Sequence, residues 1–176
     1  WRCGNEVIQK ETEQWFFKIT DYAERLLNDL EKIDWSDKIK TMQRNWIGKS
    51  EGTEIKFEIE VNGKKEVWPI FTTRPDTIYG VTFMVISALH PRLLEMTTEK
   101  KNQVLTFIKK CQKAKTPKEK ERLDKEGIFT GSYAINPITK ERVPVWAGNF
   151  VLADYGSGMV MAVPSHDQRD FEVAKK

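Results

Sequence analysis

The spacing of hydrophobic residues separates a helical beginning of the chain from a strand-rich remainder. Across residues 11–33, hydrophobic side chains recur every three or four positions, which predicts a single amphipathic helix. A second helix is predicted to start after Ser36, a helix-capping residue type, and to end before Gly48. The pattern then changes from helical to alternating. We therefore predict a lead-in over residues 1–50 and a main domain over residues 51–176.

The main domain begins with a pattern typical of a β-hairpin. Residues 55–61 alternate hydrophobic and charged side chains, residues 66–73 predict the returning strand, and Asn62-Gly63 between them is a strong turn signal. Further on, the pattern predicts a buried stretch at 82–90, a surface helix at 97–112, a turn at Asn136-Pro137, a strand at 143–153 and a short apolar strand at 159–163. Regular strand–helix–strand repeats are missing, so we expect a mixed α/β fold with a compact β-barrel core flanked by helices.

The charge balance permits a nucleic-acid partner without arguing for one. The chain has 29 basic and 26 acidic residues and a net charge of +3, whereas a protein that binds RNA by charge alone is usually more basic. Residues 113–127 are almost all charged. This run predicts a solvated helix or loop, with an RNA contact as the alternative.

Cysteine usage and the chain's ends bear on metals and on the compartment. Cys3 and Cys111 are the two cysteines and form no Cys-x-x-Cys pair, so we predict no metal site. Isolated thiols suit a reducing cytoplasm. The sequence has no long hydrophobic run and no signal peptide, so we expect no membrane partner. Because the chain begins at Trp1 rather than at methionine, we interpret it as a piece of a larger protein.

The first segment that carries candidate chemistry is Phe71-Thr-Thr-Arg-Pro-Asp-Thr77, directly after a predicted strand. Pro75 presets the first corner of a type I turn. At such a turn, the hydroxyls of Thr72, Thr73 and Thr77 and the guanidinium of Arg74 can converge on one small pocket. The alternative is a threonine-rich strand end with a purely structural turn.

The second segment surrounds two acidic residues after the last predicted strand. Ser165 and Gln168 have the spacing of a capping box, which predicts a helix from His166 onward. Asp167 and Asp170 then share one helix face and can hold a substrate ammonium group. The alternative is that these acids only stabilise the helix start. We assign His166 a structural or surface role, since neighbours in sequence point in different directions.

Together these segments resemble the leucyl-tRNA synthetase family. Four stretches carry the likeness: Thr72–Thr77 and Met161–Asp170 are similar to its two editing motifs, Met42–Glu51 to the strand and linker that lead into its inserted editing domain, and Trp1–Gly4 to the tail of a small zinc module. The resemblance covers essentially the whole chain. It implies the editing-domain fold of class I synthetases and hydrolysis of the aminoacyl ester on mis-charged leucine tRNA, within a cytoplasmic ligase of protein biosynthesis. ATP and magnesium would serve only a catalytic domain whose signatures this chain lacks, so no cofactor is expected here.

The resemblance also implies roles for individual residues. Thr77 would exclude leucine sterically, and Asp170 would anchor the substrate's α-ammonium group. Thr72 and Thr73 would hold the ester, the terminal adenosine or the attacking water. The remaining substrate contacts would come from Tyr79, Met161, Val163, Asp167 and Arg74. The implied partners are the aminoacylated 3′ end of leucine tRNA, mis-activated amino acids and the other domains of the parent synthetase.

Three rival interpretations remain open at this level. The barrel can be a module that binds the tRNA acceptor end without hydrolysis. It can be an editing domain of the isoleucyl or valyl type, although these carry Pro-Trp-Thr where this chain has Pro75-Asp76-Thr77. A nucleotide-dependent enzyme is the third, but Gly156-x-Gly158 lacks the third glycine of a dinucleotide fingerprint.

Overall fold

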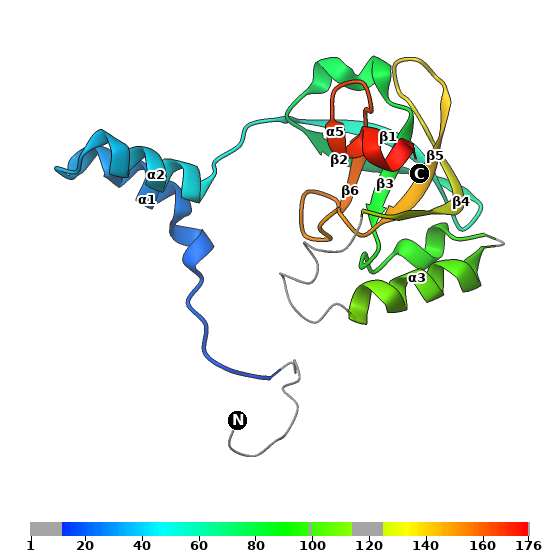
Figure 1. Ribbon diagram of the computed structural model, residues 1–176, viewed down its shortest axis with the longest axis horizontal. Coiled ribbons are helices and arrows are strands. Elements are labelled where there is room, and N and C mark those ends of the chain that lie inside the picture. The colour runs from blue at the N-terminus through cyan, green and yellow to red at the C-terminus, as the bar shows by residue number, and fades with distance from the viewer. Residues whose placement is uncertain (1–11, 99, 114–124, 176) are drawn as a thin grey trace. The chain divides into compact units, whose positions relative to one another are not determined.

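The computed structural model describes residues 12–98, 100–113 and 125–175 and separates into two compact units, Trp1–Glu51 and Gly52–Lys176 (Figure 1). The helical elements of the first unit are η1 (Ile19–Tyr22), α1 (Ala23–Asp29), η2 (Leu30–Lys32) and α2 (Asp37–Ile47). The helix predicted over residues 11–33 is confirmed for Ile19–Lys32, where η1, α1 and η2 follow one another, and is wrong for residues 12–18, which are not helical. A helix is stabilised mainly by burying its hydrophobic face. In the described part of this unit only Leu30 is buried, whereas Trp15 is fully exposed.

The second predicted helix is confirmed as α2. Gly48 ends it in the left-handed conformation, at φ 66°, and donates its N–H to the Arg44 carbonyl at 2.9 Å. Ser36 occupies the N-cap position with an extended backbone but makes no capping bond with its side chain. The strand expected within Met42–Glu51 is wrong as far as Ile47, because these residues are helical. The zinc-module tail expected at residues 1–4 lies outside the described residues.

The second unit is built around one six-stranded sheet with the order β2-β1-β4-β5-β3-β6. Its strands are β1 (Thr53–Val61), β2 (Lys64–Thr72), β3 (Phe83–Ser87), β4 (Gly127–Ile135), β5 (Arg142–Gly148) and β6 (Met159–Ala162). The predicted hairpin is confirmed: β1 and β2 pair antiparallel along their whole length. Asn62 and Gly63 both have positive φ, at 49° and 73°, as a type I′ turn requires.

The core lies between the curled sheet and the helices that cover it (Figure 1). All five residues of β3 are buried, as the hydrophobic stretch predicted, and β3 pairs parallel with β5 and antiparallel with β6. The covering elements are η3 (Pro75–Gly80), η4 (Leu93–Met96), α3 (Lys101–Lys113) and α5 (Gln168–Ala174). Helix α3 inserts Val104, Phe107 and Cys111 into the core, so its hydrophobic residues follow the predicted helical spacing.

The mixed α/β fold is confirmed, but the barrel is not closed. Strands β2 and β6 end the hydrogen-bonded order of the sheet, and no ladder joins them. Some of their Cα atoms nevertheless lie within 8 Å of each other, because the sheet curls round. Strand β6 has only four residues and Pro164 follows soon after it, which limits pairing along this edge. An open edge is where side chains and a ligand can enter between two strands.

Of the two remaining predictions, the one for the charged run is mostly untested and the one for the C-terminal helix needs a correction. Most of the charged run, residues 114–124, lies outside the described residues. The helix predicted from His166 is corrected, because α5 begins at Gln168. The backbone N–H groups of His166 and Asp167 instead close a turn on the Val163 carbonyl. Ser165 therefore lies in a turn rather than at a helix N-cap, and Asp167 caps the helix in its place.

Candidate functional site

A cleft opens between the unpaired edges β2 and β6 and has two compartments. The aromatic compartment, about 470 Å³, is lined by Phe71, Thr72, Thr73, Phe150, Val151, Leu152, Tyr155, Val160, Met161, Asp167, Arg169 and Asp170. The threonine compartment, about 180 Å³, is lined by Thr72, Thr73, Arg74, Thr77, Met161, Val163, His166, Asp167 and Asp170. Five residues line both, so the two compartments form one continuous cleft. Its combined size suits a small organic ligand.

One side of the cleft is the end of β2 and the turn after it. Thr72 accepts the backbone N–H of Arg74 through its Oγ1 at 3.0 Å, which holds the turn against the strand. The Arg74 guanidinium pairs with both carboxylate oxygens of Asp76, at 3.2 and 3.0 Å. This hydrogen-bonded pair lowers the pKa of Asp76 and raises that of Arg74. Both groups are exposed, so the pair orients Arg74 more than it stabilises the fold.

Thr77 lies one turn further on, in the 3₁₀ helix η3 that takes the place of the simple type I turn. Its side chain is buried, at 7% exposure, and its Oγ1 donates to the Arg74 carbonyl at 2.8 Å. Burial and this hydrogen bond fix its rotamer. The η3 helix is itself held from across the unit, because the buried Asn136 side chain donates to the Ile78 carbonyl at 2.9 Å. Thr77 is thus a rigid group at the boundary of the cleft.

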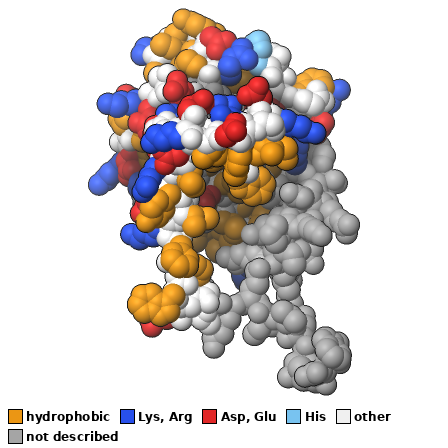
Figure 2. All heavy atoms as spheres, turned by 90° about the vertical axis from the view of Figure 1, so that its left-hand side faces the viewer, with side chains coloured by type: hydrophobic (Ala, Val, Ile, Leu, Met, Phe, Trp, Pro, Cys, Tyr) orange, Lys and Arg blue, Asp and Glu red, His pale blue; other side chains and the backbone are white. Residues whose placement is uncertain are grey.

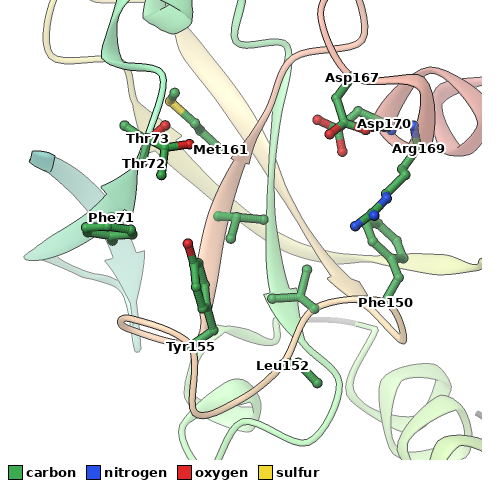
Figure 3. A pocket seen from close by; sticks show the side chains of 12 residues that line it. Phe71, Thr72, Thr73, Phe150, Leu152, Tyr155, Met161, Asp167, Arg169 and Asp170 are labelled. Atoms are coloured by element: carbon green, nitrogen blue, oxygen red, sulfur yellow. Dashed lines mark hydrogen bonds between the residues drawn. The ribbon is translucent and has the colours of Figure 1, made fainter. Parts of the chain in front are cut away.

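The opposite side of the cleft carries the two acidic residues (Figure 3). Asp167 caps α5 and accepts the backbone N–H groups of Arg169 and Asp170, at 2.7 and 3.3 Å. Asp170 accepts the backbone N–H of Val163 through Oδ2 at 2.8 Å, which ties the helix to the end of β6. Burial raises the pKa of Asp170, and the nearby Asp167 charge raises it further, while the Val163 bond acts in the opposite direction.

The structure brings together eight of the nine site residues predicted from the sequence. Thr72 and Thr73 face Asp167 and Asp170 across the cleft, with Met161 of β6 between them (Figure 3). Thr77, Arg74 and Val163 line the threonine compartment, and Thr77 and Asp170 share that cavity. Tyr79 is the exception, because its side chain is 70% exposed and lines neither compartment.

Sequence reasoning missed most of the aromatic compartment. Phe71 and Tyr155 pack edge to face, with ring centroids 5.8 Å apart. Tyr155 and Leu152 come from the loop that precedes β6, and Figure 3 shows Tyr155 on the side of Phe71 and the threonines, with Arg169 on the far side. Phe71 was expected only as part of the returning strand. Leu152 was expected within a strand over residues 143–153, which is wrong after Gly148, where β5 ends and the loop begins. An Arg immediately before Asp170 was visible, but its orientation depends on where α5 begins.

The described parts of the chain contain neither a candidate metal cluster nor a candidate membrane-spanning helix. Within residues 12–98, 100–113 and 125–175, no cluster of three or more His, Cys, Asp or Glu side chains could hold a metal ion. None of the helices described there is long and hydrophobic enough to cross a membrane. On the face drawn in Figure 2, acidic and basic side chains are interspersed, with hydrophobic side chains exposed beside them.

The cleft residues fall within a stretch that matches a known family. Residues 44–176 match the family model described as leucyl-tRNA synthetase, editing domain. The chain belongs to this family. It is 54% identical to the leucine–tRNA ligase of Geotalea daltonii over 181 residues, and 55% identical to that of Brachyspira hyodysenteriae over 179 residues. Both matches cover 100% of the chain but only 22% and 20% of the relatives, so the chain spans about a fifth of their length.

A solved structure of the same family has the same fold. A leucyl-tRNA synthetase from Agrobacterium radiobacter K84, solved as a ternary complex with tRNA and LeuAMS, matches with a TM-score of 0.72 and 36% sequence identity. The match covers 98% of this chain and 21% of that one. The editing-domain family of leucyl-tRNA synthetases therefore accounts for both the sequence and the fold, and the matched range, residues 44–176, contains both sides of the cleft.

Proposed function

We propose that this editing domain hydrolyses the ester of leucine tRNA that carries the wrong amino acid, in the cytoplasm and as part of a leucine–tRNA ligase. The observation that carries the proposal is the cleft itself. Rigid hydroxyls of Thr72 and Thr77 lie on one side and the Asp170 carboxylate on the other, around a cavity open to solvent. Hydroxyls, a carboxylate and an aromatic wall match the ester, the ammonium group and the terminal base of a charged tRNA.

The reason to edit is energetic. An aminoacylation site that distinguishes leucine from a similar amino acid by one methylene or branch gains only about 1–3 kcal/mol of discrimination. Because this leaves errors, a second site of different shape is needed to remove them. The substrates proposed here are leucine tRNAs charged with isoleucine, norvaline or another mis-activated amino acid. Leucine itself is excluded, and the steric block is assigned to Thr77, a buried group with a fixed rotamer.

Asp170 is proposed to bind the α-ammonium group that every aminoacyl ester carries. Its Oδ2 is held by the Val163 N–H, so the carboxylate is oriented, and its other oxygen would accept the ammonium. Desolvation at this position makes the negative charge costly, as the raised pKa of Asp170 records. A bound cation offsets that cost, so the pair should be stronger than one on the open surface.

The two compartments divide the substrate between them. The amino-acid side chain would enter the threonine compartment, where Thr77, Met161 and Val163 surround it. The ribose and adenine would lie in the aromatic compartment, because a base stacks favourably on rings such as Phe71 and Tyr155. Arg74 and Arg169 are proposed to meet the phosphates of the terminal nucleotides. Tyr79 is proposed to contact RNA outside the cleft, since its ring is exposed.

Hydrolysis requires water to attack the ester carbonyl carbon, after which the bond to the ribose oxygen breaks. The products are the free amino acid and tRNA with an intact 3′-terminal ribose. Thr72 and Thr73 are proposed to position the water or the ester oxygen, and a ribose hydroxyl of the substrate would pass on the proton. The residues of the cleft need no cofactor for this step. ATP and magnesium are assigned to aminoacylation elsewhere in the ligase.

The proposal is tested by replacing the matching segment of a full-length leucine–tRNA ligase, such as that of Geotalea daltonii, with this chain. We expect the chimera to release isoleucine and norvaline from leucine tRNA at least ten times faster than leucine. Asp170→Ala should abolish release while circular dichroism shows an intact fold. A chimera that binds tRNA without releasing any amino acid would instead support an acceptor-end binding module. Preferential release of amino acids from isoleucine or valine tRNA would support the sister families.

A further inference from the structure

One side of the cleft is formed by a loop, residues 149–158. Leu152 and Tyr155 project from this loop into the aromatic compartment and are 69% and 44% exposed. A second cavity of about 90 Å³ lies under the same loop, and Val151 and Leu152 line both cavities. Phe150 and Val151 pack on the hydrophobic cluster beneath the loop, whereas Leu152 lies between the two cavities and is less tightly packed. The position of residues 152–158 therefore depends also on the contacts at the end of the loop next to β6.

His90 makes the contacts at the end of the loop next to β6. The backbone N–H of Arg92 donates to His90 Nδ1 at 3.1 Å, so Nε2 carries the ring hydrogen. The Nε2 edge of the imidazole lies against the backbone at Ser157 and Gly158, where a Cβ built on Gly158 would be 3.3 Å from Nε2. Burial lowers the pKa of His90, which keeps the ring neutral and in this tautomer at pH 7. The imidazole thus connects the segment after β3 to the loop.

The glycine beside Ser157 lets the imidazole approach the loop closely. Gly158 has φ +68°, and a Cβ built there would lie 2.5 Å from His90 Cδ2. The Gly158 carbonyl also accepts the backbone N–H of Ser87 at 2.9 Å. The loop therefore meets His90 through its backbone, in a place where no other residue type fits without displacement.

His90 is itself held by a charged and aromatic cluster on its other side. Its ring lies 5.5 Å from the Trp68 ring of β2, centroid to centroid, and the Arg92 guanidinium lies 5.1 Å from the Trp68 centroid. Arg92 bonds Glu66 of β2 at 2.9 Å and Glu95 of η4 at 2.9 Å. These groups hold the imidazole against β2, the strand whose end carries Thr72. Contacts through His90 therefore link the loop to the threonine side of the cleft.

We propose that His90 is a positioning residue that holds the loop carrying Leu152 and Tyr155 at the distance from β2 needed to bind the terminal adenosine of tRNA. This inference rests on the proposed function for the identity of the ligand. His90 lines neither compartment and touches no reacting atom. Its loss should therefore weaken substrate binding remote from the ester and leave the chemical step nearly unchanged.

The test is a matched pair of substitutions in the full-length chimera, with isoleucine-charged leucine tRNA as substrate. His90→Asn places an amide oxygen where Nδ1 accepts from Arg92 but loses the N–H that faces the Ser157 backbone. His90→Gln places an amide N–H near the Nε2 position and can restore that donor. We expect His90→Asn to raise KM about tenfold with kcat within twofold of wild type. His90→Gln should return KM to within about twofold of wild type.

Hydrogen exchange of the peptide covering residues 149–158 provides a readout independent of activity. We expect faster exchange in His90→Asn than in His90→Gln. If His90→Asn does not fold, His90→Phe, which keeps a ring against Trp68 but has neither ring nitrogen, takes its place. Equal KM values for all variants, equal defects in the Asn and Gln variants, or a fall in kcat at constant KM would overturn the proposal. Failure of wild type to hydrolyse would overturn the proposed function, while exchange would still report whether His90 holds the loop.

Discussion

At the scale of single residues, Thr77 combines a committed hydroxyl with a free methyl group. Its Oγ1 donates to the Arg74 carbonyl at 2.8 Å, and its side chain is buried at the boundary of the threonine compartment. The hydroxyl therefore fixes the rotamer of Thr77, whereas the methyl group supplies the bulk that a ligand in the compartment would contact. This separation of roles can be tested because valine has the shape of threonine without the hydroxyl, and alanine lacks both branches.

We expect Thr77→Ala to release leucine from correctly charged leucine tRNA at a rate approaching that for isoleucine. Removal of the branched side chain enlarges the compartment and removes the block. Thr77→Val is the matched control: it should still reject leucine, with stability lower by about 1 kcal/mol because the Arg74 carbonyl loses its donor. Deacylation time courses and thermal unfolding measure the two effects. Continued protection of leucine tRNA in the alanine variant would refute the steric role.

Asp170 makes a second residue-scale prediction, in which activity and stability depend on pH in opposite ways. Burial raises the pKa of this carboxyl in the folded chain above its unfolded value. Its ionised form therefore costs stability above the folded pKa, and this cost disappears as the pH falls below the unfolded value. Hydrolysis should behave in the reverse sense, since only the carboxylate binds the ammonium group.

Asp170→Asn should therefore be at least as stable as wild type at pH 7, because its side-chain oxygen can still accept the Val163 N–H. The stability difference should shrink as the pH is lowered through the raised pKa of Asp170. Hydrolysis by the variant should be at least 100-fold slower than wild type at pH 7. Urea unfolding at several pH values, beside deacylation rates, would check this. Rapid hydrolysis by a folded asparagine variant would exclude the ammonium pairing.

At the scale of elements, the sequence predicted structure wherever a local signal was sufficient. Asn62-Gly63 required a hairpin turn, and Gly48 ended α2, because positive φ is a property of these residues themselves. The helix predicted over residues 11–33 was wrong for residues 12–18 because periodicity shows a hydrophobic face but not what covers it. The capping box at Ser165 was wrong because a turn closed by the Val163 carbonyl competes for the same backbone.

The candidate site divides in the same way. Both motif segments could be predicted, because the threonine hydroxyls lie close together in one short segment and the two carboxylates lie close together in the other. The loop carrying Leu152 and Tyr155 could not, because the end of this loop packs against His90, which lies more than sixty residues earlier in the sequence. Tyr79 shows the converse: it lies within two residues of Thr77, yet η3 turns its ring to solvent. Proximity along the chain predicted the motifs but not the full lining of the cleft.

Gly158 and Gly63 provide an element-scale prediction about the cleft loop. Both have positive φ, at 68° and 73°, so replacement of either by alanine costs about 1–2 kcal/mol of backbone strain. A Cβ at Gly63 meets nothing within 4 Å, whereas one at Gly158 would lie 2.5 Å from His90 Cδ2 and 2.8 Å from the Ala153 carbonyl. We expect Gly158→Ala to lower the thermal midpoint more than Gly63→Ala and to raise KM, while Gly63→Ala leaves KM unchanged. Equal effects of both changes would show that the loop tolerates displacement.

At the scale of the whole molecule, the two units differ in how they are stabilised. All residues of the two hydrophobic clusters belong to the second unit, Gly52–Lys176. In the described part of the first unit, Leu30 alone is buried, and exposed aromatic side chains include Trp15, Phe17 and Trp46. Burial of hydrophobic surface is the dominant favourable term in folding. Cooperative stability should therefore reside in the second unit.

We therefore expect residues 50–176, expressed alone, to unfold in one cooperative transition with a midpoint within about 4 °C of the 176-residue chain, equivalent to less than about 1 kcal/mol for a domain of this size. Scanning calorimetry would measure both midpoints, and near-ultraviolet circular dichroism would confirm fixed packing of Trp68 and Trp146, which lie in the retained unit. Exposed hydrophobic side chains in the first unit should make the longer chain associate at high concentration, so both are compared at low micromolar concentration. A truncated chain without a cooperative transition would mean that the core requires the lead-in, which would move the functional boundary upstream towards residue 44, where the family match begins.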